Sequence, residues 1–167
     1  WFRAQSPHNS GALYWQLNDC WPVASWAAID GDGKPKPLWF ATQRFFRDRL
    51  ITIQPREQVS ADTPNAPGPL AVCFHNDHDD TWSGPCTVRL ITLDGQTLHE
   101  LTQPVTIPPR DALQFDIPDQ YMDHPDAFLV AELDGQRATW FFRYDKDLTY
   151  PAPKFDAQIT QDATGLH

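Results

Sequence analysis

The chain has 167 residues, a formal net charge of −9 and an apolar fraction of 41%. This length suffices for one domain, or for one small domain plus part of another. The negative charge argues against nucleic acid as a partner because phosphates would be repelled. No apolar run reaches the roughly 20 residues of a membrane span, so no membrane partner is expected. The chain starts at Trp1 and has one methionine, Met122, so we expect a piece of a longer protein.

A buried strand is expected over residues 11–17, after a helix tail at 1–8. Five of these seven strand residues are apolar or aromatic, and no charge interrupts them. Asn18 and Asp19 follow at the carboxyl end, which is where ligands bind in parallel α/β folds. A loop is expected from Asp19 to about Lys36.

A helix is expected from Pro37 to about Arg47. Proline suits the first helical position, and Leu38, Ala41 and Phe45 form one apolar stripe. One strand and one helix cannot be stable alone, because a parallel strand needs neighbours on both sides.

Residues 49–150 change to the pattern of short antiparallel strands. Apolar and polar residues alternate at 70–75 and 86–91, and Asp-Gly pairs at 94–95 and 134–135 are strong hairpin signals. Seven or eight short strands without helices between them predict a mainly β fold, an immunoglobulin-like antiparallel β-sandwich. Residues 151–167 are expected to form a linker and the start of a further β module, with a strand at 155–160.

The three cysteines, Cys20, Cys73 and Cys86, lack metal-ligand spacing. Cys73 and Cys86 could face each other across a hairpin centred near Asp79 and form a disulfide. Buried free thiols are the favoured alternative, and they indicate a reducing compartment, so a cytoplasmic location is expected. The side chains of residues 75–80 could hold a divalent ion, but Asn and Asp also favour turns. No metal site and no cofactor are expected.

Seven tryptophans is a high number, and four lie within 25 positions: Trp15, Trp21, Trp26 and Trp39. Indole faces stack on the C–H faces of sugar rings, although burial in a core is the commoner use of tryptophan. Asp19 could bind a sugar hydroxyl, or it could cap the loop and orient its neighbours. The glutamates, Glu57, Glu100 and Glu132, do not form a carboxylate pair suited to glycoside hydrolysis.

The stretch Gly11-Ala-Leu-Tyr-Trp-Gln-Leu-Asn-Asp-Cys-Trp-Pro-Val-Ala-Ser-Trp26 resembles the eighth-strand segment of β-mannosidases of glycoside hydrolase family 2. The resemblance continues through residues 27–34 and 38–46 and resumes at 140–148. Its specific part is the string Trp-Gln-Leu-Asn-Asp with Trp-Pro following; a sandwich alone would not be specific.

The resemblance implies a (β/α)8 barrel, or TIM barrel, that ends with residues 1–48 and is followed by the sandwich at 49–150. It implies a hydrolase that cleaves terminal non-reducing β-D-mannose with retention. The two catalytic glutamates of the family lie on earlier barrel strands, so the chain alone is expected to hold no catalytic residue and to be inactive. An exo-β-glucosaminidase, a β-galactosidase and a non-catalytic carbohydrate-binding or spacer module stay open as alternatives.

The resemblance also implies substrate-binding residues. Trp15 would form the hydrophobic floor of the subsite for the cleaved mannose, and the peptide bond after it is expected to be cis. Asn18 and Asp19 would bind sugar hydroxyls or support groups that do. Trp21 and Trp26 would line the rim or pack the loop against the sandwich. The expected partners are a β-mannoside oligosaccharide or glycan and the rest of the barrel.

Overall fold

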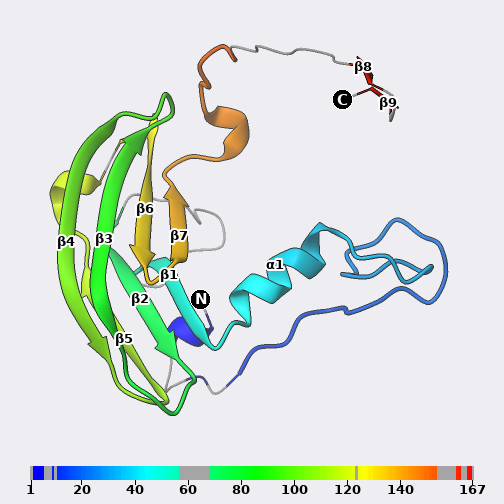
Figure 1. Cartoon of the computed structure of the whole chain (residues 1–167), viewed down its shortest axis with the longest axis horizontal. Helices are drawn as coiled ribbons and strands as arrows, with labels where there is room; N and C mark the ends of the chain where they lie inside the picture. The colour runs from blue at the N-terminus through cyan, green and yellow to red at the C-terminus, as the bar shows by residue number, and fades with distance from the viewer. Residues whose placement is uncertain are drawn as a thin grey trace.

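The computed structural model describes residues 2–5, 9, 11–56, 68–122, 124–153, 161–162 and 165–166. Its centre is a β-sandwich, and a segment with one α-helix, α1 (Pro37–Phe45), precedes the sandwich in the chain (Figure 1). Three single 3-10 turns are η1 (Arg3–Gln5), η2 (Asp119–Tyr121) and η3 (Asp145–Asp147). In the described part of the chain, no helix is long and apolar enough to cross a membrane.

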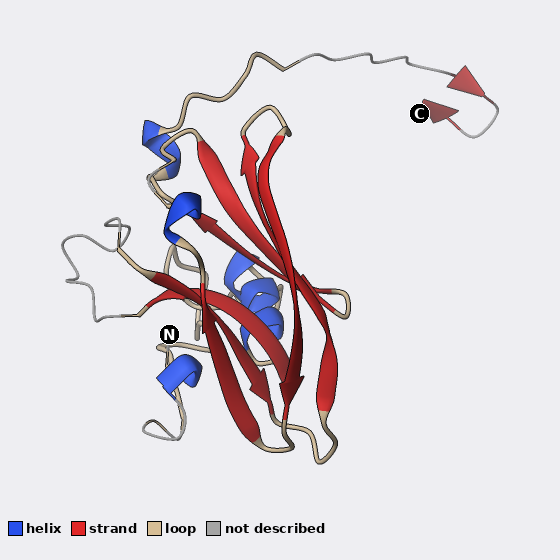
Figure 2. Ribbon diagram, turned by 90° about the vertical axis from the view of Figure 1, so that its left-hand side faces the viewer, coloured by secondary structure: helices blue, strands red, loops and turns tan. Residues whose placement is uncertain are grey.

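Seven strands form the two sheets of the sandwich (Figure 2). One sheet has the order β1-β2-β5, with β1 (Arg49–Pro55), β2 (Leu70–Asn76) and β5 (Asp111–Asp116). The other has the order β4-β3-β6-β7, with β3 (Trp82–Thr92), β4 (Thr97–Ile107), β6 (Ala127–Leu133) and β7 (Gln136–Phe141). All neighbouring strands are antiparallel, which confirms the predicted fold class. A short hairpin pairs β8 (Gln161–Asp162) with β9 (Gly165–Leu166).

The hydrophobic core lies between the two sheets. Every residue of β2 is buried, and in β3 the alternate residues Cys86, Val88 and Leu90 are fully buried. Trp82 and Tyr121 are the largest fully buried side chains, and both belong to this core. Although all of β2 is buried, only its alternate residues Leu70, Val72 and Phe74 belong to the core cluster, so the alternation marks the side chains that face the core, as expected for a sandwich.

The two Asp-Gly pairs form the turns that their sequence predicts. Asp94 and Gly95 join β3 to β4, and Asp134 and Gly135 join β6 to β7. Asp134 and Gly135 have φ values of 49° and 73°. A two-residue hairpin turn of type I′ requires positive φ at both positions, which glycine and aspartate tolerate best.

The connection from β2 to β3 is not the hairpin that the sequence suggested. β2 pairs with β1 and β5, whereas β3 pairs with β4 and β6, so residues 77–81 cross from one sheet to the other. Cys73 and Cys86 are buried free thiols, as favoured above, and burial raises the pKa of each to about 11. The pairing was wrong because alternation identifies a strand without identifying its partner.

Asn76 fastens this crossing to the β4–β5 connection. Its side chain is fully buried, and Nδ2 donates to the carbonyl oxygens of Asp80 (2.7 Å) and Pro108 (3.0 Å). Its Oδ1 accepts a hydrogen bond from the backbone N–H of His78 at 3.3 Å. The side-chain amide of Asn76 thus holds the polar residues that follow β2 in a turn.

Replacing Asn76 with leucine should lower the free energy of unfolding of the chain. Leucine has a similar size but leaves the part-buried backbone groups that Asn76 contacts without these partners, at a cost of about 1–3 kcal/mol. Urea unfolding followed by circular dichroism would measure the change. Gln103→Leu at an exposed position of β4 is the control, with an expected change within ~0.5 kcal/mol. Equal midpoints for Asn76→Leu and the wild type would contradict this role.

The segment before the sandwich differs from the prediction in one element. Helix α1 begins at Pro37 as predicted, but residues 11–17 form no strand, and Leu13 is 98% exposed. A parallel strand exists only through its neighbours, and no described part of this chain forms a ladder with it. The helix tail was predicted at residues 1–8, and the helical structure described there is the 3-10 turn η1. The strand predicted at 155–160 lies outside the described residues.

Candidate functional site

The predicted site lies on the segment that runs out to a loop and returns through α1 (Figure 1). The peptide bond between Trp15 and Gln16 is cis, as the resemblance implied. The Trp15 side chain is 77% exposed. An indole held at the surface in this way offers a flat apolar face to a ligand or to another part of the protein.

Residues 16–19, directly after the cis peptide, are held by residues 27–29. Three backbone hydrogen bonds join the two stretches: Ala28 N to Gln16 O (3.1 Å), Ile29 N to Leu17 O (2.9 Å) and Asp19 N to Ile29 O (3.0 Å). Lys36 N donates to Ala28 O at 2.8 Å and brings the start of α1 to the same place. Ala27 and Ala28 are buried there.

The carboxylate of Asp19 lies inside this loop. Its side chain is 2% exposed, and it accepts hydrogen bonds from Lys36 Nζ at 2.8 Å and Ser25 Oγ at 2.6 Å. Ser25 Oγ also accepts a hydrogen bond from the backbone N–H of Ala27. The hydrogen bond from Lys36, followed by that from Ser25, holds the pKa of Asp19 below its usual value, and burial opposes this only in part. Asp19 is therefore ionised at neutral pH.

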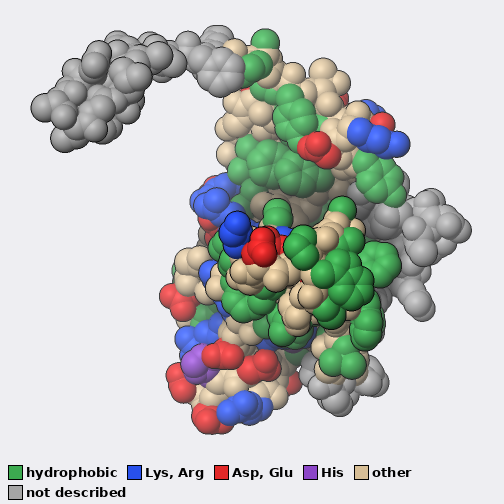
Figure 3. Space-filling view, turned by 90° about the vertical axis from the view of Figure 1, so that its right-hand side faces the viewer, with side chains coloured by type: hydrophobic (Ala, Val, Ile, Leu, Met, Phe, Trp, Pro, Cys, Tyr) green, Lys and Arg blue, Asp and Glu red, His purple; other side chains and the backbone are tan. Residues whose placement is uncertain are grey.

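The other predicted site residues are exposed. Trp21 and Trp26 lie in the loop with exposed fractions of 65% and 70%, and the Asn18 amide donates to the carbonyl oxygen of Asp19 at 3.2 Å. Figure 3 looks onto this side of the molecule and shows apolar side chains gathered there. Further exposed apolar residues of the segment are Leu13, Leu17 and Val23.

Gly31 packs directly on the backbone of Trp21. A Cβ atom at Gly31 would lie 2.5 Å from the carbonyl carbon of Trp21 and 2.8 Å from the nitrogen of Pro22. Any larger residue must displace that backbone, so glycine fixes the close approach. Ser25, Gly31 and Lys36 were not predicted as site residues. In the sequence, the one signal that could have pointed to a cation such as Lys36 is the position of Asp19, an acid close behind the apolar run 11–17.

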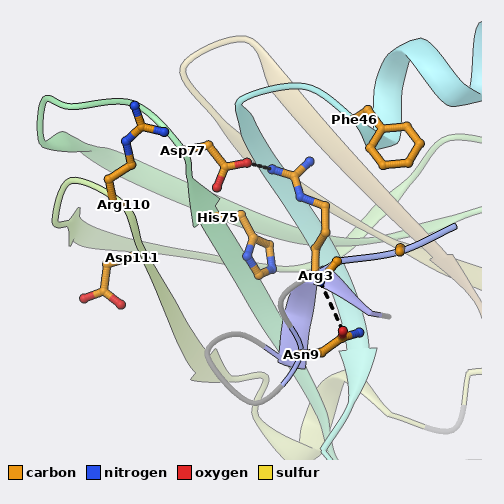
Figure 4. Close-up of a pocket in the computed structure, with 9 residues that line it drawn as sticks. Arg3, Asn9, Phe46, His75, Asp77, Arg110 and Asp111 are labelled. Carbon is orange, nitrogen blue, oxygen red and sulfur yellow. Dashed lines mark hydrogen bonds and ion pairs between the residues drawn. The ribbon is translucent and has the colours of Figure 1, made fainter.

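A separate polar cavity of about 260 Å³ lies between the N-terminal residues and β2 (Figure 4). Arg3 at its edge donates to the carbonyl oxygens of Phe45 (2.8 Å) and Arg47 (2.7 Å) and pairs with Asp77 at 2.8 Å. Arg3 thus ties the end of α1 to the sandwich. None of the predicted substrate-binding residues lines this cavity, so we assign it to the junction.

His75 lines the same cavity and should make stability depend on pH. Burial is the main cause that lowers its pKa to about 4, against about 6.5 in an unfolded chain. The unfolded state therefore binds more protons between these values, and the stability present above pH 6.5 is lost as the pH falls towards 4. Urea midpoints between pH 7 and 4 should fall more steeply for the wild type than for His75→Gln. Parallel curves would contradict this expectation.

The glutamates of the sandwich form ion pairs on its four-stranded sheet. Arg89 on β3 pairs with Glu100 at 2.5 Å and with Glu132 at 2.8 Å, and Arg137 also pairs with Glu132. These contacts hold the pKa of Glu132 below its usual value, with Arg137 as the largest cause. Both carboxylates are structural ion-pair partners. Glu57 lies outside the described residues.

No family model matches the chain, but two comparisons do find relatives. Among curated proteins it is similar to β-mannosidase B of Emericella nidulans (47% identical over 47 residues) and of Aspergillus terreus (57% over 47 residues). Each match covers 28% of this chain and 6% of the relative. Among solved structures, the crystal structure of a β-D-mannosidase from Dictyoglomus thermophilum matches with a TM-score of 0.73 and 28% identity. The resemblance to β-mannosidases is confirmed.

The structural match to the Dictyoglomus β-mannosidase extends beyond the sandwich. It covers 90% of this chain and 18% of that chain. Residues 1–48 are more than a quarter of the present chain, so a match of this extent must include most of them. The segment with Trp15 and the sandwich therefore occur together in a β-mannosidase.

Proposed function

We propose that this chain is part of a retaining, exo-acting β-mannosidase of glycoside hydrolase family 2, which removes terminal non-reducing β-D-mannose. The observation that carries the proposal is the exposed Trp15, followed by a hydrogen-bonded loop, in a chain that resembles β-mannosidases. The natural substrate is then a β-mannoside oligosaccharide or glycan.

In this proposal the chain contributes a sugar-binding wall and not the catalytic groups. Trp15 supports a mannose ring that is distorted towards an oxocarbenium-like state, and an indole face offers it no competing hydrogen bonds. Asn18, Trp21 and Trp26 complete the wall. The catalytic glutamates come from other parts of a TIM barrel, whose remaining strands cover the exposed Leu13 and Leu17. The sandwich buttresses that barrel.

We also propose a cytoplasmic location for the whole protein. The unpaired thiols of Cys73 and Cys86 support it, because buried free cysteines are common in reducing compartments.

The proposal is tested with the purified full-length protein. Its kcat/KM on a chromogenic β-mannoside should exceed that on the matching β-glucoside, β-galactoside and β-glucosaminide. The first product seen by NMR should be β-mannose, as retention requires. Residues 1–167 alone should give no turnover. Preference for another sugar, inverted product or an active fragment would each overturn the corresponding part of the proposal.

A further inference from the structure

The carboxylate of Asp19 is closed to a ligand. A carboxylate has about four acceptor positions, so two hydrogen bonds from Lys36 and Ser25 do not fill it. Burial nevertheless keeps a ligand from the free acceptor positions, because only 2% of the Asp19 side chain is exposed. A sugar hydroxyl could reach it only after Lys36 or Ser25 had moved away. An acid in this setting holds protein groups in place.

The groups that Asp19 holds belong to three parts of the segment. Asp19 itself follows Trp15 by four positions, within the stretch paired to residues 27–29. Ser25 directly precedes Trp26, and its hydroxyl also accepts from the N–H of Ala27. Lys36 directly precedes α1, and its ammonium additionally reaches Ser25 Oγ at 3.3 Å. The Asp19–Lys36 ion pair and its hydrogen bonds to Ser25 therefore connect the stretch after Trp15, the residue before Trp26 and the start of the helix.

The loop at residues 19–36 has little regular structure to hold it in one conformation. Residues 19–36 contain no helix or strand. Apart from the Asp19, Ser25 and Lys36 contacts, they are held by one isolated bridge between Ile29 and Pro35, a few backbone hydrogen bonds and the turn at residues 30–34. Trp21 and Trp26 are exposed, so burial of their own side chains does not fix them. Their positions must then follow from the backbone that Asp19, Ser25 and Gly31 hold.

We propose that Asp19, Ser25 and Lys36 form a positioning clamp, which fixes Trp15 and Trp26 as walls of one sugar subsite without touching the sugar. This inference rests on the proposed function and deepens it. It assigns Asp19 a positioning role in place of the substrate contact, and it adds Ser25 and Lys36 to the groups on which sugar binding depends.

The clamp is tested in the full-length protein with Asp19→Asn, Lys36→Met and the double variant. Lys36→Met leaves the buried Asp19 carboxylate without its counter-charge, Asp19→Asn leaves the partly exposed Lys36 ammonium without its own, and the double change removes both charges. We expect KM for a β-mannoside to rise about tenfold in each single variant, and no further in the double variant. Asp32→Asn, an exposed acid of the same loop, is the control and should keep the wild-type KM.

The alternatives give different results. If Asp19 acted by binding the sugar, Asp19→Asn would raise KM while Lys36→Met would leave it unchanged. A purely structural role would lower kcat through the loss of folded protein and leave KM unchanged. Either result overturns the clamp.

Hydrogen exchange tests the clamp without an assay. The amides of Ala28 and Ile29, which pair with Gln16 and Leu17, should exchange at least tenfold faster in Asp19→Asn. Peptides from β2 should keep their wild-type rates. If the wild type does not hydrolyse β-mannosides, the proposed function fails while this experiment still decides on the clamp. Unchanged exchange at residues 28–29 would overturn it.

Discussion

Replacing Trp15 with alanine should lower kcat/KM of the full-length protein on a β-mannoside by roughly ten- to 150-fold. The indole is 77% exposed in this chain, so its face is free to be covered by a sugar ring. Covering a large aromatic side chain with apolar C–H groups contributes about 1.5–3 kcal/mol, and a stacked face lost in the transition state costs that amount. The conversion of about 1.36 kcal/mol per tenfold gives the stated range.

The control for Trp15→Ala is a variant that removes only part of the aromatic surface. Trp15→Phe keeps an aromatic ring of smaller area and should fall between the wild type and Trp15→Ala. The free energy of unfolding should change by less than ~0.5 kcal/mol in both, if the residue acts on substrate and not on packing. A Trp15→Ala protein with wild-type kcat/KM would rule out the floor role, whatever the sugar preference of the enzyme.

The sandwich could be predicted from the sequence because its signals are local. Alternation marked β2 and β3, and the pairs Asp94-Gly95 and Asp134-Gly135 marked hairpins whose turns need positive φ. The crossing between the sheets at residues 77–81 had no such signal. A short polar turn fits a hairpin and a crossing equally well, and the choice depends on which strands supply the other edge of each sheet.

The site could be predicted only in part, for two physical reasons. Trp15 and its cis peptide followed from the family resemblance, since composition alone favours a core role for any tryptophan. The partners of Asp19 did not follow from it. Lys36 is 17 residues away through an irregular loop, and Lys34 is as near in sequence, so spacing could not choose between them. The expected strand at 11–17 failed because strand structure depends on neighbours that the described chain does not supply.

The second large effect is expected in the core, where Trp82→Ala should lower the free energy of unfolding of the chain by about 3–5 kcal/mol. Trp82 is 2% exposed and packs edge-on against Phe74 with ring centroids 6.2 Å apart. The guanidinium of Arg49 lies over its ring at 5.8 Å. Alanine leaves a cavity between the sheets that β2 and β3 cannot close, because both are fixed by neighbours on each side.

A comparison of Trp82 with Trp26 shows whether the loss of stability depends on burial of the side chain or on removal of any tryptophan. Trp26, which is 70% exposed, should lose less than ~0.5 kcal/mol on replacement with alanine, whereas Trp82→Ala removes a large part of the 5–15 kcal/mol typical of a domain. Urea unfolding followed by circular dichroism measures both variants without relying on tryptophan fluorescence. Trp82→Phe should recover part of the loss, since a ring still contacts Phe74. Equal losses at Trp82 and Trp26 would mean that the space between the sheets is not the core that stabilises this chain.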